Sequence, residues 1–591
     1  MKKLFIVLLS LLMVLSLVGC SQKKEVVKMT PGTYTAVSTG FKGDIEVSVT
    51  VSEDKIENIE VLNHHETNGI GSEAMPYMSE NMLKYQTVNV DSCAGATVTS
   101  AGFRMAVKDA LSQAGADMEI FNARPQKGET TQEKIDVDVV VVGAGAAGMM
   151  SAYYAAKEGN NVLIIEKTPM VGGASSMAGG AIFGTGSKWQ KELGYEDSTD
   201  ALKAKLLAQG HNKNDEATVD LFMSFISENV DWILDENGGA MPYKKEGTGA
   251  TFSMDGSGSG VMLALKERME KAGAKLLTST KATELIVDNG TVVGVKASGE
   301  ETDYTINAKA VILATGGYGH NTSLLPEEYK NYRYSGHAGH DGDALTMIEA
   351  VDGATRNIPW VNMAVHSMIL PSGVPQYTNM GYVVFNKMSG IEVNQDGVRY
   401  GAEVGHDWEL IQAMKKNERQ YLIMDQANYD AFNEGMSKRG IFSAEDPEKW
   451  TSDDYTGQPF YKKGATLEEL AEKINVPAEN LKATVEKFNE TVNSGAKEDE
   501  YGRVLNTTIS EEGPYYALEM SLRYSTSLGG ICINDNMQVL NANNEAVEGL
   551  YAAGEVIGGV QGDLYLPSST FTWAMTSGVQ TGKVVSELLA K

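Results

Sequence analysis

Residues 138–167 read DVVVVGAGAAGMMSAYYAAKEGNNVLIIEK, and this stretch decides the fold. It predicts a buried strand over 138–142, a glycine-rich turn, a helix over 149–157 and a second strand over 162–165, the order that opens a parallel βαβ sheet. The glycines permit a tight turn and close approach of a pyrophosphate to the helix N-terminus, and an acid about 20 residues later can hold a ribose. The segment predicts a dinucleotide site formed by Gly143, Gly145, Ala146, Ala147, Gly148, Glu166 and Lys167.

Three later glycine-rich stretches indicate which dinucleotide binds. They are residues 172–176, 314–317 and 549–559, and they resemble the flavin loops of the fumarate reductase flavoprotein family over residues 135–591. The resemblance implies noncovalent FAD, held in part by Gly173, Ala174, Ser175, Gly316, Gly554 and Glu555. It implies an α/β fold in which a Rossmann-like, GR2-type FAD-binding domain, 135–360 and 527–591, is split by an α+β capping domain over 361–526, with substrate between cap and flavin.

A second motif lies upstream, in a small α+β domain expected over 29–119 and joined by a linker over 120–134. Strands are predicted at 44–51 and 56–61 and an amphipathic helix at 102–115. Residues 91–97, DSCAGAT, with His65, Glu66 and Thr67 upstream, resemble the FMN-binding domain of respiratory flavoproteins. That resemblance implies that a flavin transferase links FMN covalently, through its phosphate, to the hydroxyl of Thr97. The alternative is a plain turn before a helix, with Thr99 or Ser100 as its N-cap.

The N-terminus has the pattern of an export signal. Lys2 and Lys3 precede an apolar run over 4–18, which is short for a membrane span. The run ends in Leu17-Val18-Gly19-Cys20, which resembles a bacterial lipobox. We expect a signal peptide over 1–19, a tether over 20–28 and lipidation of Cys20, which would anchor the protein on the outer face of the cell membrane. The alternative is an ordinary secretory signal.

Composition limits the partners. The chain has 591 residues, with 50 Lys and Arg against 78 Asp and Glu, a formal net charge of −28. Such a field repels nucleic acid, which we therefore exclude as a partner. Within the folded part only Cys93 and Cys532 are present, too few for a disulfide framework, and no metal-binding pattern accompanies them, so we predict no metal site.

Two flavins in one chain predict an electron relay. FMN would collect electrons from a membrane or extracellular donor, and FAD would pass a hydride to a C=C bond conjugated to a carbonyl group. NAD(P)H is disfavoured as the donor because no second nucleotide fingerprint is visible.

The catalytic residues of fumarate reductases are largely missing. Residues 397–403 match the family's Gly-x-Arg-Phe-x-x-Glu, but His406 lies near the place where the catalytic Arg is expected. The family's substrate-binding His falls on Thr526 and its carboxylate-clamping Arg on Tyr565, and only His366 keeps a fumarate-like residue. Without either Arg, we expect no bidentate cation for a dianion.

The replacement at Tyr565 suggests a neutral substrate. Leu564 to Ser569 resembles the closing motif of flavin 3-ketosteroid dehydrogenases, which implies that the Tyr565 hydroxyl and the Ser569 amide bind a ketone oxygen. The leading hypothesis is an FAD-dependent ene-reductase of a neutral enone of the 3-ketosteroid kind, with Tyr524 and Thr526 also near substrate. Tyr382, His366, His406 and Tyr524 are the candidate proton donors. The first alternative is respiratory reduction of an unsaturated carboxylate such as fumarate, urocanate or acrylate, and the second is a non-enzymatic flavin electron carrier.

Overall fold

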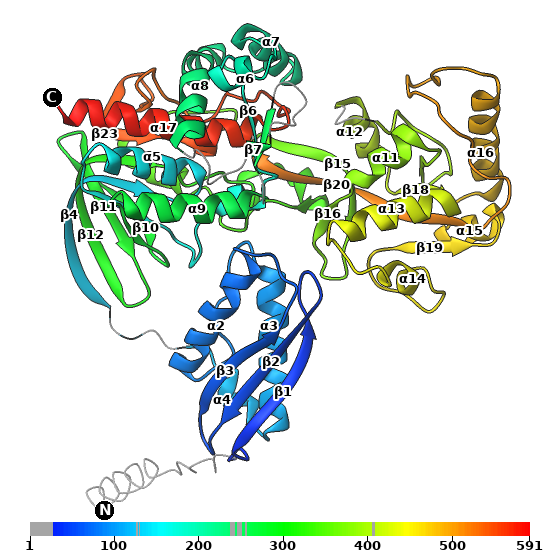
Figure 1. The fold of residues 1–591 in the computed structure, drawn as a ribbon, viewed down its shortest axis with the longest axis horizontal. Helices are drawn as coiled ribbons and strands as arrows, with labels where there is room; N and C mark the ends of the chain where they lie inside the picture. The colour runs from blue at the N-terminus through cyan, green and yellow to red at the C-terminus, as the bar shows by residue number, and fades with distance from the viewer. Residues whose placement is uncertain are drawn as a thin grey trace, which may run out of the picture.

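The computed structural model describes residues 28–125, 128, 130–236, 243–244, 251–254, 257–404 and 408–591. These residues form a small N-terminal α+β domain, a large α/β domain and a separate α+β cap (Figure 1). In the view of Figure 1 the N-terminal domain, in blue, lies below the other two. The mixed α/β fold expected from the sequence is confirmed. Cys20 lies outside the described residues.

The N-terminal domain packs helices on a three-stranded antiparallel sheet of order β1-β2-β3. Its alternating apolar residues, such as Ile45, Val47 and Val49, are buried under the helices. The bounds are β1 Gly32–Thr39, β2 Asp44–Val51, β3 Ile56–Asn63, α2 Gly71–Tyr85, α3 Thr97–Gln113 and α4 Met118–Phe121. Helix α3 starts five residues before the predicted start. Ala96 is its N-cap, and Thr99 and Ser100 are buried inside it, so neither is the cap that the alternative reading placed there.

The large domain is built on a sheet of order β10-β11-β12-β4-β5-β9, with β22 and β23 added beside β12. Strands β12, β4, β5, β9 and β23 run parallel, as βαβ units require. The bounds are β4 Thr131–Val142, β5 Val162–Ile165, β9 Lys275–Leu277, β10 Lys281–Asp288, β11 Thr291–Ser298, β12 Thr302–Leu313, β22 Gln538–Leu540 and β23 Ala546–Ala552. Strand β4 begins inside the predicted linker, because residues 131–134 pair with residues 302–305 of β12.

Helices cover this sheet, and the N-terminus of α5 follows the glycine turn of β4 directly. The C-terminal helix α17 packs on α5 so closely that a Cβ at Gly578 would lie 2.5 Å from the Ala147 carbonyl oxygen. The bounds are α5 Ala146–Lys157, η1 Gly173–Met177, α6 Lys188–Glu192, α7 Thr199–Gln209, α8 Glu216–Glu236, α9 Ser257–Lys271, α10 Asp343–Met347 and α17 Ser569–Leu589. Three short strands, β6 Ala181–Phe183, β8 Thr251–Met254 and β7 Tyr243–Lys244, form a separate antiparallel sheet.

The cap has its own sheet, of order β16-β15-β20-β18-β17, with β13 and β19 also paired to β20. Strands β15 and β20 extend from the large domain into the cap (Figure 1). The bounds are β13 Arg333–Tyr334, β15 Val361–Ile369, β16 Pro375–Tyr377, β17 Ile391–Asn394, β18 Gln420–Asp425, β19 Tyr461–Gly464 and β20 Tyr515–Ser527. The cap helices are α11 Asn379–Lys387, α12 Trp408–Lys415, α13 Gln426–Lys438, α14 Asp446–Trp450, α15 Leu467–Ile474 and α16 Ala478–Asn493. Because β13 joins this sheet, the cap sheet includes residues that the sequence analysis assigned to the first FAD segment.

Candidate active site

One cavity of about 1160 Å³ lies where the three parts of the molecule meet. The N-terminal domain contributes Thr67 and residues 95–99 to its wall, and the cap contributes residues 374–377. The large domain lines it with the predicted nucleotide loops, among them Gly143, Gly145, Gly173, Gly316 and Glu555. The motifs that the sequence analysis treated separately therefore line one cavity.

The glycine turn after β4 has no room for side chains. Gly143 has φ +107°, and a Cβ at Gly148 would lie 1.8 Å from the Gly143 carbonyl oxygen. Gly145 is the N-cap of α5, so the first amides of that helix face the cavity that Ala146 and Ala147 line. This is the arrangement that holds a pyrophosphate at a helix N-terminus.

Glu166 and Lys167 follow β5 on the wall of the same cavity. The Glu166 Oε2 atom accepts a hydrogen bond from the Ala144 amide at 2.8 Å, and Oε1 accepts from the Thr168 amide at 2.8 Å. The carboxylate therefore braces the glycine turn in addition to facing the place of a ribose. Lys167 Nζ lies 2.8 Å from Asp341 and 2.6 Å from Asp343, so its charge is balanced by two carboxylates.

The remaining predicted FAD residues lie beside the same glycine turn or on the cavity wall. Gly173, Ala174 and Ser175 lie in η1, and the Ala146 amide donates to Ser175 Oγ at 3.4 Å. Gly554 adopts φ +80°, and its neighbour Glu555 accepts a hydrogen bond from the Ser527 amide at 2.8 Å. Burial raises the pKa of the Glu555 carboxyl to about 7, against the opposing effect of the Ser527 hydrogen bonds. These features fit a bound FAD.

Thr97 is the first residue of α3 and lines the cavity with its side chain exposed. The loop before it is anchored to the first turn of α3, because the Cys93 amide donates to Ser100 Oγ at 3.1 Å. Glu66 accepts hydrogen bonds from the Thr99 hydroxyl at 2.5 Å and from the Phe41 amide at 2.7 Å. The hydroxyl of Thr97 is thus presented at the N-terminus of a well-anchored helix, a setting that fits a phosphate.

Tyr565 lines the cavity beside an arginine that the sequence analysis missed. Burial raises the pKa of the Tyr565 phenol, and the positive charge of Arg523 opposes the rise. The Arg523 Nη1 group donates to Ser335 Oγ at 2.7 Å, and its guanidinium lies 5.1 Å from the centre of the Tyr377 ring. Arg523 stands three residues before Thr526, which also lines the cavity. An arginine therefore lines the cavity, although the sequence analysis expected no bidentate cation for a dianion.

Two residues predicted beside the substrate are engaged elsewhere. The Ser569 amide donates to the Leu566 carbonyl at 3.0 Å, and its buried hydroxyl donates to Gln561, so the predicted amide donor to a ketone oxygen is occupied. Tyr524 is 2% exposed and packs against Tyr329 and Tyr334 in the core. Neither residue lines the cavity, whereas Ser568 and Thr570 do.

The other proton-donor candidates do not meet Tyr565 among the described residues. His366 is fully buried, with Nδ1 2.8 Å from Glu392 Oε1, and packs on Phe385. The Tyr400 hydroxyl donates to the other oxygen of Glu392 at 2.6 Å. His366 thus belongs to a cap cluster that is not part of the cavity wall. Tyr382 lies in α11, the description does not extend to its side chain, and His406 lies outside the described residues.

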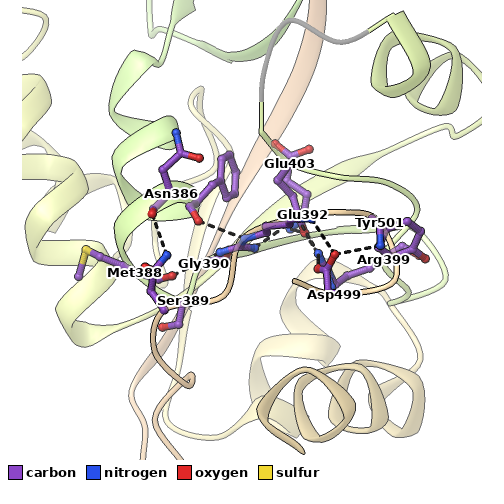
Figure 2. A network of polar contacts seen from close by, with 12 residues as sticks. Asn386, Met388, Ser389, Gly390, Glu392, Arg399, Glu403, Asp499 and Tyr501 are labelled. Atoms are coloured by element: carbon purple, nitrogen blue, oxygen red, sulfur yellow. Dashed lines mark hydrogen bonds and ion pairs between the residues drawn. The ribbon is translucent and has the colours of Figure 1, made fainter. Parts of the chain in front are cut away.

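The motif at 397–403 that matches the reductase family forms a structural network in the cap (Figure 2). Arg399 binds Glu403 through two hydrogen bonds of 2.7 Å and also reaches Asp499. Arg503, 1% exposed, donates to Gly390 and Glu403. Each of these buried charges has a partner of opposite charge, as burial requires, and none of the four residues lines the cavity.

Comparison with known proteins identifies the family. The FAD binding domain family matches residues 138–570, and the FMN-binding domain family matches residues 40–112. The chain is 31% identical over 595 residues to the urocanate reductase of Eggerthella lenta. The match covers 96% of this chain and 95% of that protein. This chain belongs to the family of FAD-dependent urocanate and fumarate reductases. It is therefore a flavin-dependent oxidoreductase of C=C bonds whose cofactors are FAD and FMN.

Solved structures support the same assignment. The open conformation of a flavocytochrome c3 fumarate reductase matches with a TM-score of 0.63 and 26% identity, covering 77% of this chain and 78% of that one. The 3-ketosteroid-Δ4-(5α)-dehydrogenase of Rhodococcus jostii matches with a TM-score of 0.60 and 24% identity, covering 76% and 97%, and shares the fold. The relatives thus favour the carboxylate alternative over the steroid-like enone.

Among the described residues, no group of His, Cys, Asp and Glu is placed to hold a metal ion. Within the same residues, no helix has both the length and the hydrophobicity needed to cross a bilayer.

Proposed function

We propose that this protein reduces the C=C bond of an unsaturated monocarboxylate, with the carboxylate bound by Arg523 and Tyr565. The observation that carries the proposal is the position of Arg523 in the flavin cavity, close enough to Tyr565 to affect its pKa. In a chain of net charge −28, an anionic substrate needs such a local cation. Arginine suits the task because its planar fork matches a carboxylate.

The charges around the cavity favour one carboxylate over two. Arg523 is the one arginine among the described residues that line it. Lys167 is paired with Asp341 and Asp343, and Lys281 lies 2.8 Å from Asp343, so these lysines are already neutralised. The remaining lysine on the cavity wall, Lys42, belongs to the N-terminal domain and not to the parts that carry Arg523 and Tyr565. A dianion such as fumarate would leave its second carboxylate without a comparable partner.

The two residues suit the developing charge as well as the ground state. FAD, when bound, supplies the hydride. Negative charge then grows toward the carboxylate, and Arg523 and Tyr565 stabilise it by donating hydrogen bonds. Because burial raises the pKa of Tyr565, its phenol stays protonated at neutral pH and remains a donor. The aromatic face of Tyr377 on the Arg523 guanidinium holds that group in one orientation.

A neutral enone is the second candidate, and Tyr565 is the residue that favours it. The predicted partner donor, the Ser569 amide, is bonded to Leu566, so a ketone oxygen would lack the neutral second donor that was expected. A panel of acrylate, cinnamate, urocanate, fumarate and neutral enones, assayed with reduced methyl viologen, separates the candidates. We expect the monocarboxylates to be reduced fastest. Turnover confined to neutral enones, or fumarate reduced ahead of every monocarboxylate, would contradict the proposal.

We also infer that FMN is attached covalently to Thr97 by a flavin transferase. The exposed hydroxyl at the N-terminus of α3 supports this inference. Thr97→Ala should lose the flavin that survives denaturation, whereas Thr97→Ser keeps a hydroxyl and should retain part of it. In-gel fluorescence after coexpression with a flavin transferase measures both variants. Fluorescence of Thr97→Ala equal to that of the wild type would refute the attachment site.

We further propose that the protein is lipid-anchored through Cys20 on the outer face of the membrane and receives electrons from a membrane or extracellular donor. The lipobox-like residues 17–20 support the anchor. Cys20→Ala should move the protein from the membrane fraction to the soluble fraction of cells. An unchanged membrane fraction would refute the lipid anchor.

A further inference from the structure

The loop that precedes Thr97 contacts His337, a side chain of the FAD-binding domain. Gly95 adopts φ +85°, and a Cβ at this position would lie 3.0 Å from His337 Nε2. The imidazole is 7% exposed, and the backbone of Ala94 lies close enough to raise its pKa. The contact therefore needs both the glycine on one domain and the histidine on the other.

The neighbours of His337 fix its protonation. Its Nδ1 atom accepts a hydrogen bond from the Gly339 amide at 3.1 Å, so the proton of the neutral ring is on Nε2 and can be donated to the Ala94 carbonyl. The groups facing the ring are His340, Lys167 and Asp341. Burial, with the charges of His340 and Lys167, lowers the pKa of His337 to about 3, so the ring stays neutral at physiological pH.

A second histidine continues the contact toward the FAD loops. The rings of His337 and His340 lie 5.7 Å apart between centroids. His340 Nε2 would be 2.5 Å from a Cβ at Gly316, and its Nδ1 is 3.5 Å from Glu555. The pair thus lies between the loop that carries Thr97 and two loops that line the FAD site, with both histidines on the cavity wall.

The two domains also meet at other places. Met170 packs against the core of the N-terminal domain, and a Cβ at Gly69 would lie 2.9 Å from Leu263 Cδ1. Lys84 Nζ is 2.7 Å from Glu301, with both side chains well exposed. Tyr77 donates to Glu300 at 2.6 Å. Neither Lys84 nor Tyr77 lines the cavity. The Lys84–Glu301 pair is exposed and contributes little energy, and neither Lys84 nor Tyr77 belongs to the loop at 93–97 or bonds to it.

We propose that His337 is the positioning residue that docks the FMN-bearing loop on the FAD-binding domain and so sets the separation of the two flavins. The Nε2–H group points to the Ala94 carbonyl, and the Nε2–Cδ2 edge of the ring fits against the bare backbone of Gly95. The inference rests on the presence of both cofactors and does not depend on which unsaturated compound is reduced.

Hydrogen–deuterium exchange on the holoprotein tests the docking directly. His337→Ala should speed exchange of the amides over 93–98 by about tenfold, the equivalent of one buried hydrogen bond. His337→Gln keeps an N–H donor near the position of Nε2 and should restore much of the protection. Lys84→Ala, which removes an exposed contact between the same domains, serves as the matched control and should leave these amides unchanged.

A kinetic readout separates docking from general damage. After photoreduction by a deazaflavin flash, electrons redistribute between the two flavins, and we expect this phase to slow by at least about tenfold in His337→Ala while the content of FMN and FAD stays at the wild-type level. The rate of redistribution in His337→Gln should lie between the rates of the wild type and of His337→Ala. Unchanged exchange and unchanged redistribution in both His337 variants, or an equal effect of Lys84→Ala, would overturn the proposal.

Discussion

Glu555 shows how a single buried carboxyl makes this site sensitive to pH. Burial raises its pKa from 4.5 to about 7. Below pH 4.5 the group is protonated in both the folded and the unfolded chain and has no differential effect. Between pH 4.5 and 7 the unfolded chain releases the proton first, so the folded state loses stability as pH rises.

Glu555→Gln removes this titration while keeping an acceptor for the Ser527 amide. We compare the two proteins without bound flavin. We expect their free energies of unfolding to be equal near pH 4.5, and that of the variant to be higher by about 3 kcal/mol above pH 7. Denaturant unfolding at a series of pH values measures the difference. A difference that does not grow with pH would show that Glu555 is ionised in the fold at all these values.

At the scale of single residues, the glycine loops of the cavity wall have a clear local sequence signal, whereas Arg523 has almost none. The glycine turn at 143–148 has a local signal, because the spacing of its glycines marks the positions where the packed backbone leaves no room for a side chain. Arg523, in contrast, reaches the cavity because β20 pairs with β13 and passes beside the loop of Tyr565. Its only local signal is a charged residue in an alternating strand just before Thr526, which is too weak to indicate a site.

Elements with a strong apolar pattern were predicted closely. The predictions at 44–51 and 162–165 coincide with β2 and β5, because alternating and continuous burial leave clear patterns. Strand β4 was predicted too short, since residues 131–134 are polar and exposed and owe their extended form to pairing with β12. The start of α3 was missed for a related reason: Thr97, Thr99 and Ser100 are small, polar residues typical of loops.

The crossing of α5 and α17 is the element-scale contact most sensitive to volume. A Cβ at Gly578 would lie 2.5 Å from the Ala147 carbonyl, so the helices must move apart and displace the glycine turn that begins α5. We expect Gly578→Ala to destabilise the fold by about 1–3 kcal/mol and to weaken FAD retention.

The matched control is Gly260→Ala in α9, where the added Cβ meets open space. This change should be neutral or stabilise by up to about 1 kcal/mol through helix propensity. Thermal unfolding and the FAD content of the purified variants measure both effects. Equal melting temperatures for the two variants would show that the α5–α17 crossing relaxes without cost.

At the scale of the whole molecule, one cavity joins three parts that are far apart in sequence. The N-terminal domain brings Thr97, the large domain brings the FAD loops, and the strands that lead to the cap bring Arg523. A two-flavin reductase follows from the family, and the anionic substrate that we propose is argued from Arg523 on the cavity wall.

The most direct test compares one unsaturated acid with its methyl ester in the wild type and in Arg523→Gln. We predict that the wild type prefers the acid in kcat/KM, and that Arg523→Gln lowers kcat/KM for the acid by about 10- to 100-fold while leaving the ester within about threefold, as expected for loss of a charged hydrogen-bond pair. An ester preference in the wild type, or equal losses for acid and ester in the variant, would contradict a carboxylate held by Arg523.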